Sequence, residues 1–168
     1  QTLAIQGAGA FTVTGHDSTG TLTKTSTAAT DITLAARATG TLALGADTTG
    51  TDAITADALL DTEVLTMTGA NDATVALVAG DLSATTYTGA LTVTATSGTN
   101  VIATGSGIDT ITGGGGADTL SGGAGLDTYV ALTDVASANG IDAITMDTVD
   151  GSAISGDIFN FTASAAFI

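Results

Sequence analysis

Six glycines recur at a fixed interval of nine residues, and this period constrains the fold more than any other feature of the chain. An apolar or aromatic residue follows each of these glycines by four positions. The period is much shorter than that of helical repeats, so each unit has room for one turn and one short strand. The glycines are Gly80, Gly89, Gly98, Gly107, Gly116 and Gly125, and the residues that follow are Ala84, Val93, Ile102, Ile111, Leu120 and Tyr129.

The last three units are explicit nonapeptides, Thr104–Thr112, Gly113–Ser121 and Gly122–Val130. Glycine at the first, second and fourth positions lets the backbone adopt positive φ angles and direct its carbonyl groups toward a common point. Aspartate at the sixth position adds a carboxylate to these carbonyls. Calcium takes six to eight oxygen ligands, more than one turn supplies. The sequence therefore predicts calcium sites shared between turns, with the last three residues of each unit forming a strand.

Two nonapeptides make one coil, so alternate repeats are expected to stack on the same side at the spacing of adjacent strands. Asp109 should then stack on Asp127, with one calcium ion between them. Asn100 should stack on Asp118 in a weaker site, because asparagine brings no charge. Without metal, the paired carboxylates would repel each other. Folding and calcium binding are therefore expected to be linked.

These units resemble the Gly-Gly-x-Gly-x-Asp-x-U-x repeat of the RTX family, in which U is a large apolar residue. Thr104 departs from this pattern at the first position, and the preceding unit, 95–103, keeps only Gly98, Asn100 and Ile102. The resemblance implies a parallel β-roll with calcium-bound turns, secreted by type I export. The residues expected to form the calcium sites are Asn100, Gly105, Gly107, Asp109, Gly114, Gly116, Asp118, Gly123, Gly125 and Asp127.

The rest of the chain also reads as all-β, because branched apolar residues alternate with small polar ones between turn residues. Strands are expected at 11–14, 31–34, 41–44, 64–67, 74–77 and 91–94, and their spacing suits a sandwich, a barrel or a solenoid. One helix is expected within Asp52–Val64. The chain is divided into a calcium-poor strand region (1–94), an RTX β-roll (95–130) and a capping segment (131–168).

The carboxyl-terminal segment contains Gly156–Phe161, which is similar to the strand that closes RTX rolls. Phe159 and Phe161 alternate with polar residues, as a capping strand requires, and a plain hairpin is the alternative. The aspartates at 142, 147, 150 and 157 are irregularly spaced and do not fit an EF-hand loop.

The net charge of −15, with only Lys24 and Arg37 as cations, argues against binding to nucleic acid or to anionic lipid. Cysteine is absent, which excludes disulfide scaffolds and thiolate metal sites. No apolar run approaches the ~18 residues of a membrane-spanning helix. No secretory signal peptide is recognisable, and an excerpt of a longer protein is the favoured interpretation.

The chain is not expected to be an enzyme. His16 is the single histidine and is expected in a turn, and no G-x-S-x-G or H-E-x-x-H motif is present. The leading hypothesis is a structural protein of the bacterial cell surface, an S-layer or sheath component that forms a homo-oligomer or a two-dimensional lattice. Surface polysaccharide is a further candidate partner. The alternatives are a calcium-binding module of a giant RTX adhesin and the secretion domain of an RTX exoenzyme.

Overall fold

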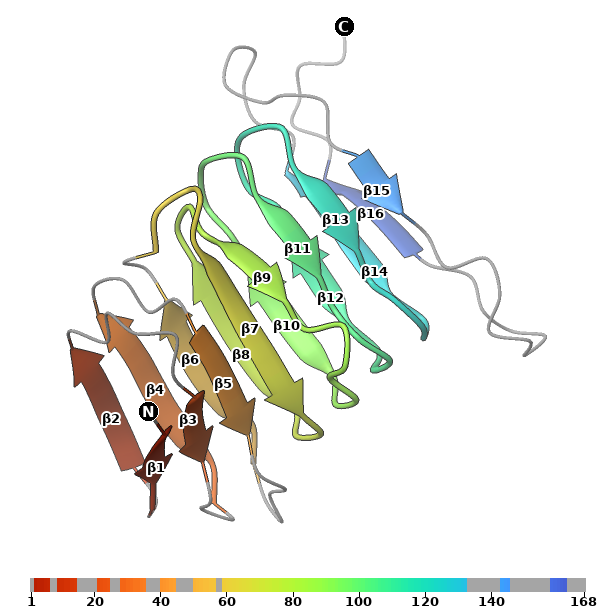
Figure 1. Ribbon diagram of the computed structural model, residues 1–168. Coiled ribbons are helices and arrows are strands. Elements are labelled where there is room, and N and C mark those ends of the chain that lie inside the picture. The colour runs from red at the N-terminus through yellow and green to blue at the C-terminus, as the bar shows by residue number, and fades with distance from the viewer. Residues whose placement is uncertain are drawn as a thin grey trace, which may run out of the picture.

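The chain folds into a parallel β-solenoid whose two sheets stack face to face along one axis (Figure 1). The computed structural model describes residues 2–6, 9–14, 21–24, 28–35, 40–44, 50–56, 59–132, 143–145 and 158–162. Successive strands alternate between the sheets, and within each sheet every strand pairs in parallel with the strand two further along the chain. Of the three expected architectures, the solenoid is confirmed.

Each sheet has eight strands. The odd-numbered sheet contains β1 (Thr2–Ile5), β3 (Thr21–Lys24), β5 (Gly40–Leu44), β7 (Val64–Gly69), β9 (Asp81–Ser83), β11 (Val101–Ala103), β13 (Thr119–Ser121) and β15 (Ala143–Thr145). The even-numbered sheet contains β2 (Gly9–Thr14), β4 (Thr30–Ala35), β6 (Asp52–Ala56), β8 (Ala73–Leu77), β10 (Leu91–Thr94), β12 (Thr110–Thr112), β14 (Thr128–Leu132) and β16 (Ile158–Thr162).

The turns between the sheets form two edges. Edge A carries the turns that lead from odd to even strands, at 70–72, 84–90, 104–109 and 122–127. Edge B carries the described turns from even to odd strands, at 59–63, 78–80, 95–100 and 113–118. Turns on one edge therefore lie one full coil apart, so that alternate nonapeptides are neighbours in space. The expected stacking of alternate repeats is confirmed by the register of Thr110 with Thr128 and of Val101 with Thr119.

The core is a layer of inward-facing side chains between the two sheets. The alternation of branched apolar and small polar residues places the apolar ones inside, as period-two strands require. The U residues Ile102, Ile111, Leu120 and Tyr129 are all buried. The same core layer continues toward the amino terminus through Leu22, Ile32, Leu42, Ile54, Leu65, Met67, Val75, Leu82 and Val93.

The helix expected within Asp52–Val64 is wrong. Residues 52–56 form β6 and Val64 begins β7, and a turn at Asp61 and Thr62 precedes it. The Glu63 amide donates to the Leu60 carbonyl at 2.8 Å, which closes this turn. The alternation of Ala53, Ile54 and Thr55 fits a strand, and pairing with β4 and β8 on both sides outweighs the weak local helical preference of the sequence.

The carboxyl-terminal strand extends the even sheet. β16 pairs in parallel with β14, with Phe159 opposite Tyr129 and Phe161 opposite Ala131. β15 pairs in parallel with β13 in the other sheet. The two strands thus continue the coil instead of forming a hairpin. Both sheets pass through positions 94 and 130 without interruption, and the division into three regions stays a prediction about calcium content.

Candidate calcium sites

The four predicted turns meet in pairs, one pair on each edge. On edge A, the turn with Gly105, Gly107 and Asp109 lies one coil before the turn with Gly123, Gly125 and Asp127. On edge B, the turn that ends at Asn100 lies one coil before the turn with Gly114, Gly116 and Asp118. The structure therefore brings Asp109 to Asp127 and Asn100 to Asp118, the pairs that the nine-residue period predicts.

Each carboxylate accepts a hydrogen bond from the backbone of the preceding coil. Asp127 Oδ1 accepts from the Asp109 amide at 2.9 Å, and Asp118 Oδ1 accepts from the Asn100 amide at 2.9 Å. Asp109 Oδ1 accepts in the same way from the Leu91 amide at 2.7 Å. These bonds orient the carboxylates inward between the coils. The exposed fraction of Asp109, Asp118, Asp127 and Asn100 is at most 1%.

Oδ2 of Asp109 and Oδ1 of Asn100 are buried and accept no hydrogen bond among the described residues. A buried acceptor without a partner is costly, and a buried carboxylate without a counter-charge more so. A hard cation supplies what both oxygens lack, because calcium prefers oxygen ligands. The residues thus fit calcium. On edge A, the ion would be held by the Asp109 and Asp127 carboxylates together with backbone carbonyls of the two turns.

Burial raises the pKa of Asp109 above its ordinary value of 3.8. The hydroxyl of Thr104 and the amides of Leu91 and Gly105 act in the opposite direction but do not offset the desolvation. The environment of Asp109 is therefore unfavourable to its own charge in the absence of a cation.

The glycines of the repeat are required by space as well as by backbone conformation. Gly116 and Gly125 both have a φ of 131°, and a Cβ atom at either would overlap a glycine carbonyl of the preceding coil. At the first position the reason differs, because a Cβ on Gly122 would strike the Asp127 carboxylate. Positive φ was expected at all three glycine positions, but Gly105, Gly107, Gly113 and Gly122 do not adopt it.

Thr104 replaces the first glycine without disrupting the roll. Its side chain turns to the next coil, where Oγ1 donates to the Gly122 carbonyl at 2.7 Å. This contact joins the same two turns that Asp109 and Asp127 join. Sequence reasoning treated Thr104 only as a departure from the repeat, and nothing in the local sequence shows that its hydroxyl reaches the following coil.

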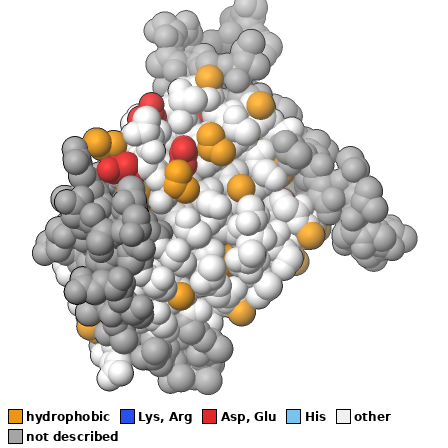
Figure 2. Space-filling view, in the orientation of Figure 1, with side chains coloured by type: hydrophobic (Ala, Val, Ile, Leu, Met, Phe, Trp, Pro, Cys, Tyr) orange, Lys and Arg blue, Asp and Glu red, His pale blue; other side chains and the backbone are white. Residues whose placement is uncertain are grey.

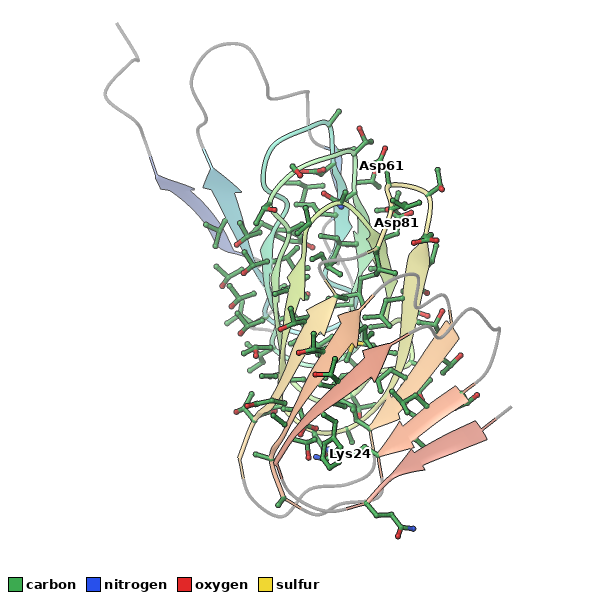
Figure 3. The ribbon with its side chains drawn as sticks, turned by 90° about the vertical axis from the view of Figure 1, so that its left-hand side faces the viewer. Lys24, Asp61 and Asp81 are labelled. Carbon is green, nitrogen blue, oxygen red and sulfur yellow. The ribbon has the colours of Figure 1, made fainter. Side chains whose placement is uncertain are left out.

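Edge B carries two acids that the sequence did not single out. Asp61 Oδ1 accepts from the Thr99 amide at 3.0 Å, and Asp81 Oδ1 accepts from the Val101 amide at 2.7 Å. Both acids lie on earlier coils, and their partners Thr99 and Val101 stand on either side of Asn100. Asn100 itself donates through Nδ2 to the Gly80 carbonyl at 2.8 Å. Figure 3 shows Asp61 and Asp81 together at this edge and Lys24 at the opposite one.

Among the described residues no three side chains of His, Cys, Asp or Glu gather into a metal cluster. A nonapeptide site does not need one, because each turn contributes a single carboxylate and the carbonyls of its backbone. Asp142, Asp147, Asp150, Asp157, His16 and Arg37 lie outside the described residues.

Parallel coils, buried inter-coil carboxylates and glycine turns together define a calcium-binding β-roll. The family model of the RTX calcium-binding nonapeptide repeat, in four copies, matches residues 94–129. Residues 94–129 are therefore RTX calcium-binding repeats, and the parallel solenoid that contains them fits an RTX β-roll. Comparison with curated proteins and with solved structures gave no match.

Proposed function

We propose that this chain is a calcium-stabilised structural component of a bacterial surface layer, an S-layer or a sheath-like lattice, exported by type I secretion. In this role the roll acts by assembly and not by catalysis. Calcium outside the cell would complete the fold after export, because buried carboxylates between coils need a counter-ion. The RTX repeats support calcium binding and secretion, and the lattice is the further step.

The observation that carries the proposal is that charged side chains are rare on the faces of the two sheets. From β7 to β14 the strands contain one charged residue, Asp81, which is the first residue of β9. The outward positions are mostly hydroxyl-bearing or small, as at Thr92, Thr94 and Thr119. Figure 2 shows such a face, largely uncharged, with acidic side chains gathered near its upper left border. Flat faces of this kind suit packing between copies.

The turns at the edges of the solenoid, unlike the sheet faces, carry exposed acidic side chains. Asp61 and Asp72 are exposed acids on edge B and edge A respectively. Two copies that approach edge to edge would bring like charges together, which is unfavourable unless a divalent cation lies between them. Calcium would thus act twice, inside the roll and between rolls.

Among the described residues no helix is long and apolar enough to cross a membrane.

Electron microscopy of the purified chain with and without calcium tests the proposal. Ordered two-dimensional or tubular arrays are expected in calcium, and dispersed particles are expected in chelator. Monomers at every calcium concentration would exclude a lattice role. The alternative roles are then separated by the sequence that precedes this chain in its gene, where tandem near-identical domains indicate an adhesin and a protease or lipase motif indicates an exoenzyme.

A further inference from the structure

A third aspartate occupies the column of Asp109 and Asp127 on edge A, far from the repeats. Asp52 begins β6 and is the register partner of Ala73, which in turn is the partner of Leu91. The register of Thr92 with Thr110 and of Thr110 with Thr128 continues this column to Asp109 and then to Asp127. Position by position, Asp52 is therefore equivalent to the two aspartates of the predicted calcium site.

Asp52 also makes the same backbone contact. Its Oδ1 accepts from the Thr30 amide of the preceding coil at 2.8 Å, just as Asp109 Oδ1 accepts from Leu91 and Asp127 Oδ1 accepts from Asp109. The exposed fraction of Asp52 is 0%, the same as that of Asp109 and Asp127. The surroundings of the three carboxylates thus agree in position, orientation and burial.

The three carboxylates differ in what neutralises them. Lys24 Nζ lies 2.6 Å from Asp52 Oδ1, and both side chains have an exposed fraction of 0%. Asn71, on the following turn of edge A, donates through Nδ2 to Asp52 Oδ2 at 3.4 Å. The buried Asp52 carboxylate therefore has the Lys24 ammonium group beside it as a counter-charge. Lys24 is one of only two cationic residues in a chain with a net charge of −15. Among the described residues, it lies beside the single carboxylate of this column that is outside the repeats.

We propose that the Lys24 ammonium occupies the place of a metal ion in the Asp52 coil and makes the coils around it, from β3 to β8, fold without calcium. The buried carboxylates of this column are then neutralised in two ways, by the Lys24 ammonium in the amino-terminal coils and by calcium in the RTX coils. The amino-terminal coils would serve as a preformed template on which the RTX coils add when calcium is supplied. From the proposed function this inference takes only the need of Asp109 and Asp127 for calcium.

Hydrogen exchange followed by mass spectrometry tests the proposal, because it reports protection coil by coil. In the wild-type protein, amides of β6 and β8 should stay protected in both calcium and EDTA. Amides of β12 and β14 should be protected in calcium alone. Loss of protection in β6 and β8 on addition of EDTA would overturn the proposal. Persistent protection of β12 and β14 in EDTA would instead contradict calcium-dependent folding of the RTX coils, while protected β6 and β8 would still support the role of Lys24.

Two variants separate charge from packing. Lys24→Met keeps the length of the side chain but leaves the Asp52 carboxylate buried without its ammonium partner, which should lower protection in β6 by roughly a hundredfold to a thousandfold. Lys24→Met with Asp52→Asn removes both charges, and the asparagine oxygen still accepts from the Thr30 amide. The double variant should therefore recover most of the protection. Equal losses in the single and double variants would show that Lys24 acts through packing alone, and would overturn the proposal.

Discussion

The backbone amide of Asp109 donates to the carboxylate of Asp127, 18 residues further along the chain, at 2.9 Å. This bond fixes the distance between two acidic turns and aims the second carboxylate at the first. It also shows why one nonapeptide is not a calcium site. The predicted ligands Asp109 and Asp127 belong to two different coils, so the predicted site can form only when the coils stack.

Chelation should therefore unfold the RTX coils. Addition of EDTA to the calcium-bound protein should lower the β signal in far-ultraviolet circular dichroism, and excess calcium should restore it, because the buried carboxylates lose and regain their counter-ion. Magnesium at the same concentration is the control, since it demands a smaller octahedral site and dehydrates reluctantly. A β signal that EDTA leaves unchanged would contradict linked folding.

Asp127→Asn should raise the calcium concentration needed for half-maximal folding by about tenfold or more, because calcium affinity follows the number of charged ligands. The asparagine oxygen can still accept from the Asp109 amide, so the geometry of the turn is preserved. Asp31→Asn is the matched control, since it makes the same chemical change at an exposed position of β4. A calcium titration followed by circular dichroism gives both midpoints. Equal midpoints would rule out Asp127 as a ligand.

Gly116→Ala should destabilise the roll more than Gly9→Ala does. Gly116 has a φ of 131° and Gly9 has a φ of 128°, so both substitutions carry a similar backbone strain of about 1–3 kcal/mol. A Cβ at Gly9 meets nothing within 4 Å, whereas a Cβ at Gly116 overlaps the Gly98 carbonyl. The overlap should add about 1–3 kcal/mol. Urea unfolding in saturating calcium measures the difference, and equal losses would show that the coils do not approach so closely.

The pKa of Asp109 gives the metal-free roll an unusual dependence on pH. Because burial raises this pKa above 3.8, the native state keeps the proton at pH values where the unfolded state has released it. The contribution of Asp109 to stability therefore falls as pH rises from 3.8 through the raised pKa, and the penalty is complete above it. In EDTA, where the RTX coils are expected to unfold at neutral pH, acidification should restore more of their β signal in circular dichroism in the wild type than in Asp109→Asn. Parallel pH profiles of the two proteins would contradict this assignment.

The RTX coils could be predicted in detail from the sequence, because their strict period of nine makes every coil 18 residues long. Register, inward residues and turn pairs all follow from this period. The amino-terminal coils lack a constant length, as the separation of 22 residues between Thr30 and Asp52 shows. Individual strands such as 41–44 could be recognised there, but a solenoid could not be told from a sandwich without the register.

The Lys24 contact could not be predicted from the sequence. Its partner Asp52 lies 28 residues away, on a strand of the other sheet, within a segment where a helix was expected. The register of β4 with β6 brings Thr30 to Asp52. Lys24 reaches Asp52 from β3 in the facing sheet. In coils of irregular length, the sequence spacing does not show which residues are in contact. In coils of constant length, it does.

Asn100 provides the last prediction, because it stands in the one predicted site where an amide replaces a carboxylate. Its Nδ2 donates to the Gly80 carbonyl at 2.8 Å, whereas Asp109 at the equivalent place of edge A accepts from the Leu91 amide. Asn100→Asp loses this donor and sets a second negative charge beside Asp118. Without calcium the variant should be less stable than the wild type, because two buried carboxylates then repel each other.

In calcium, Asn100→Asp is expected to bind the ion more tightly than the wild type does. The added charge should strengthen the edge B site and lower the calcium midpoint by about threefold to tenfold, since ligand charge tunes affinity. Asn100→Ala is the control, because it loses the same donor without adding a charge and should weaken folding at every calcium concentration. Unfolding midpoints across a calcium titration distinguish the two variants. If Asn100→Asp and Asn100→Ala respond to calcium alike, edge B holds no ion between Asn100 and Asp118, and edge A alone staples the roll.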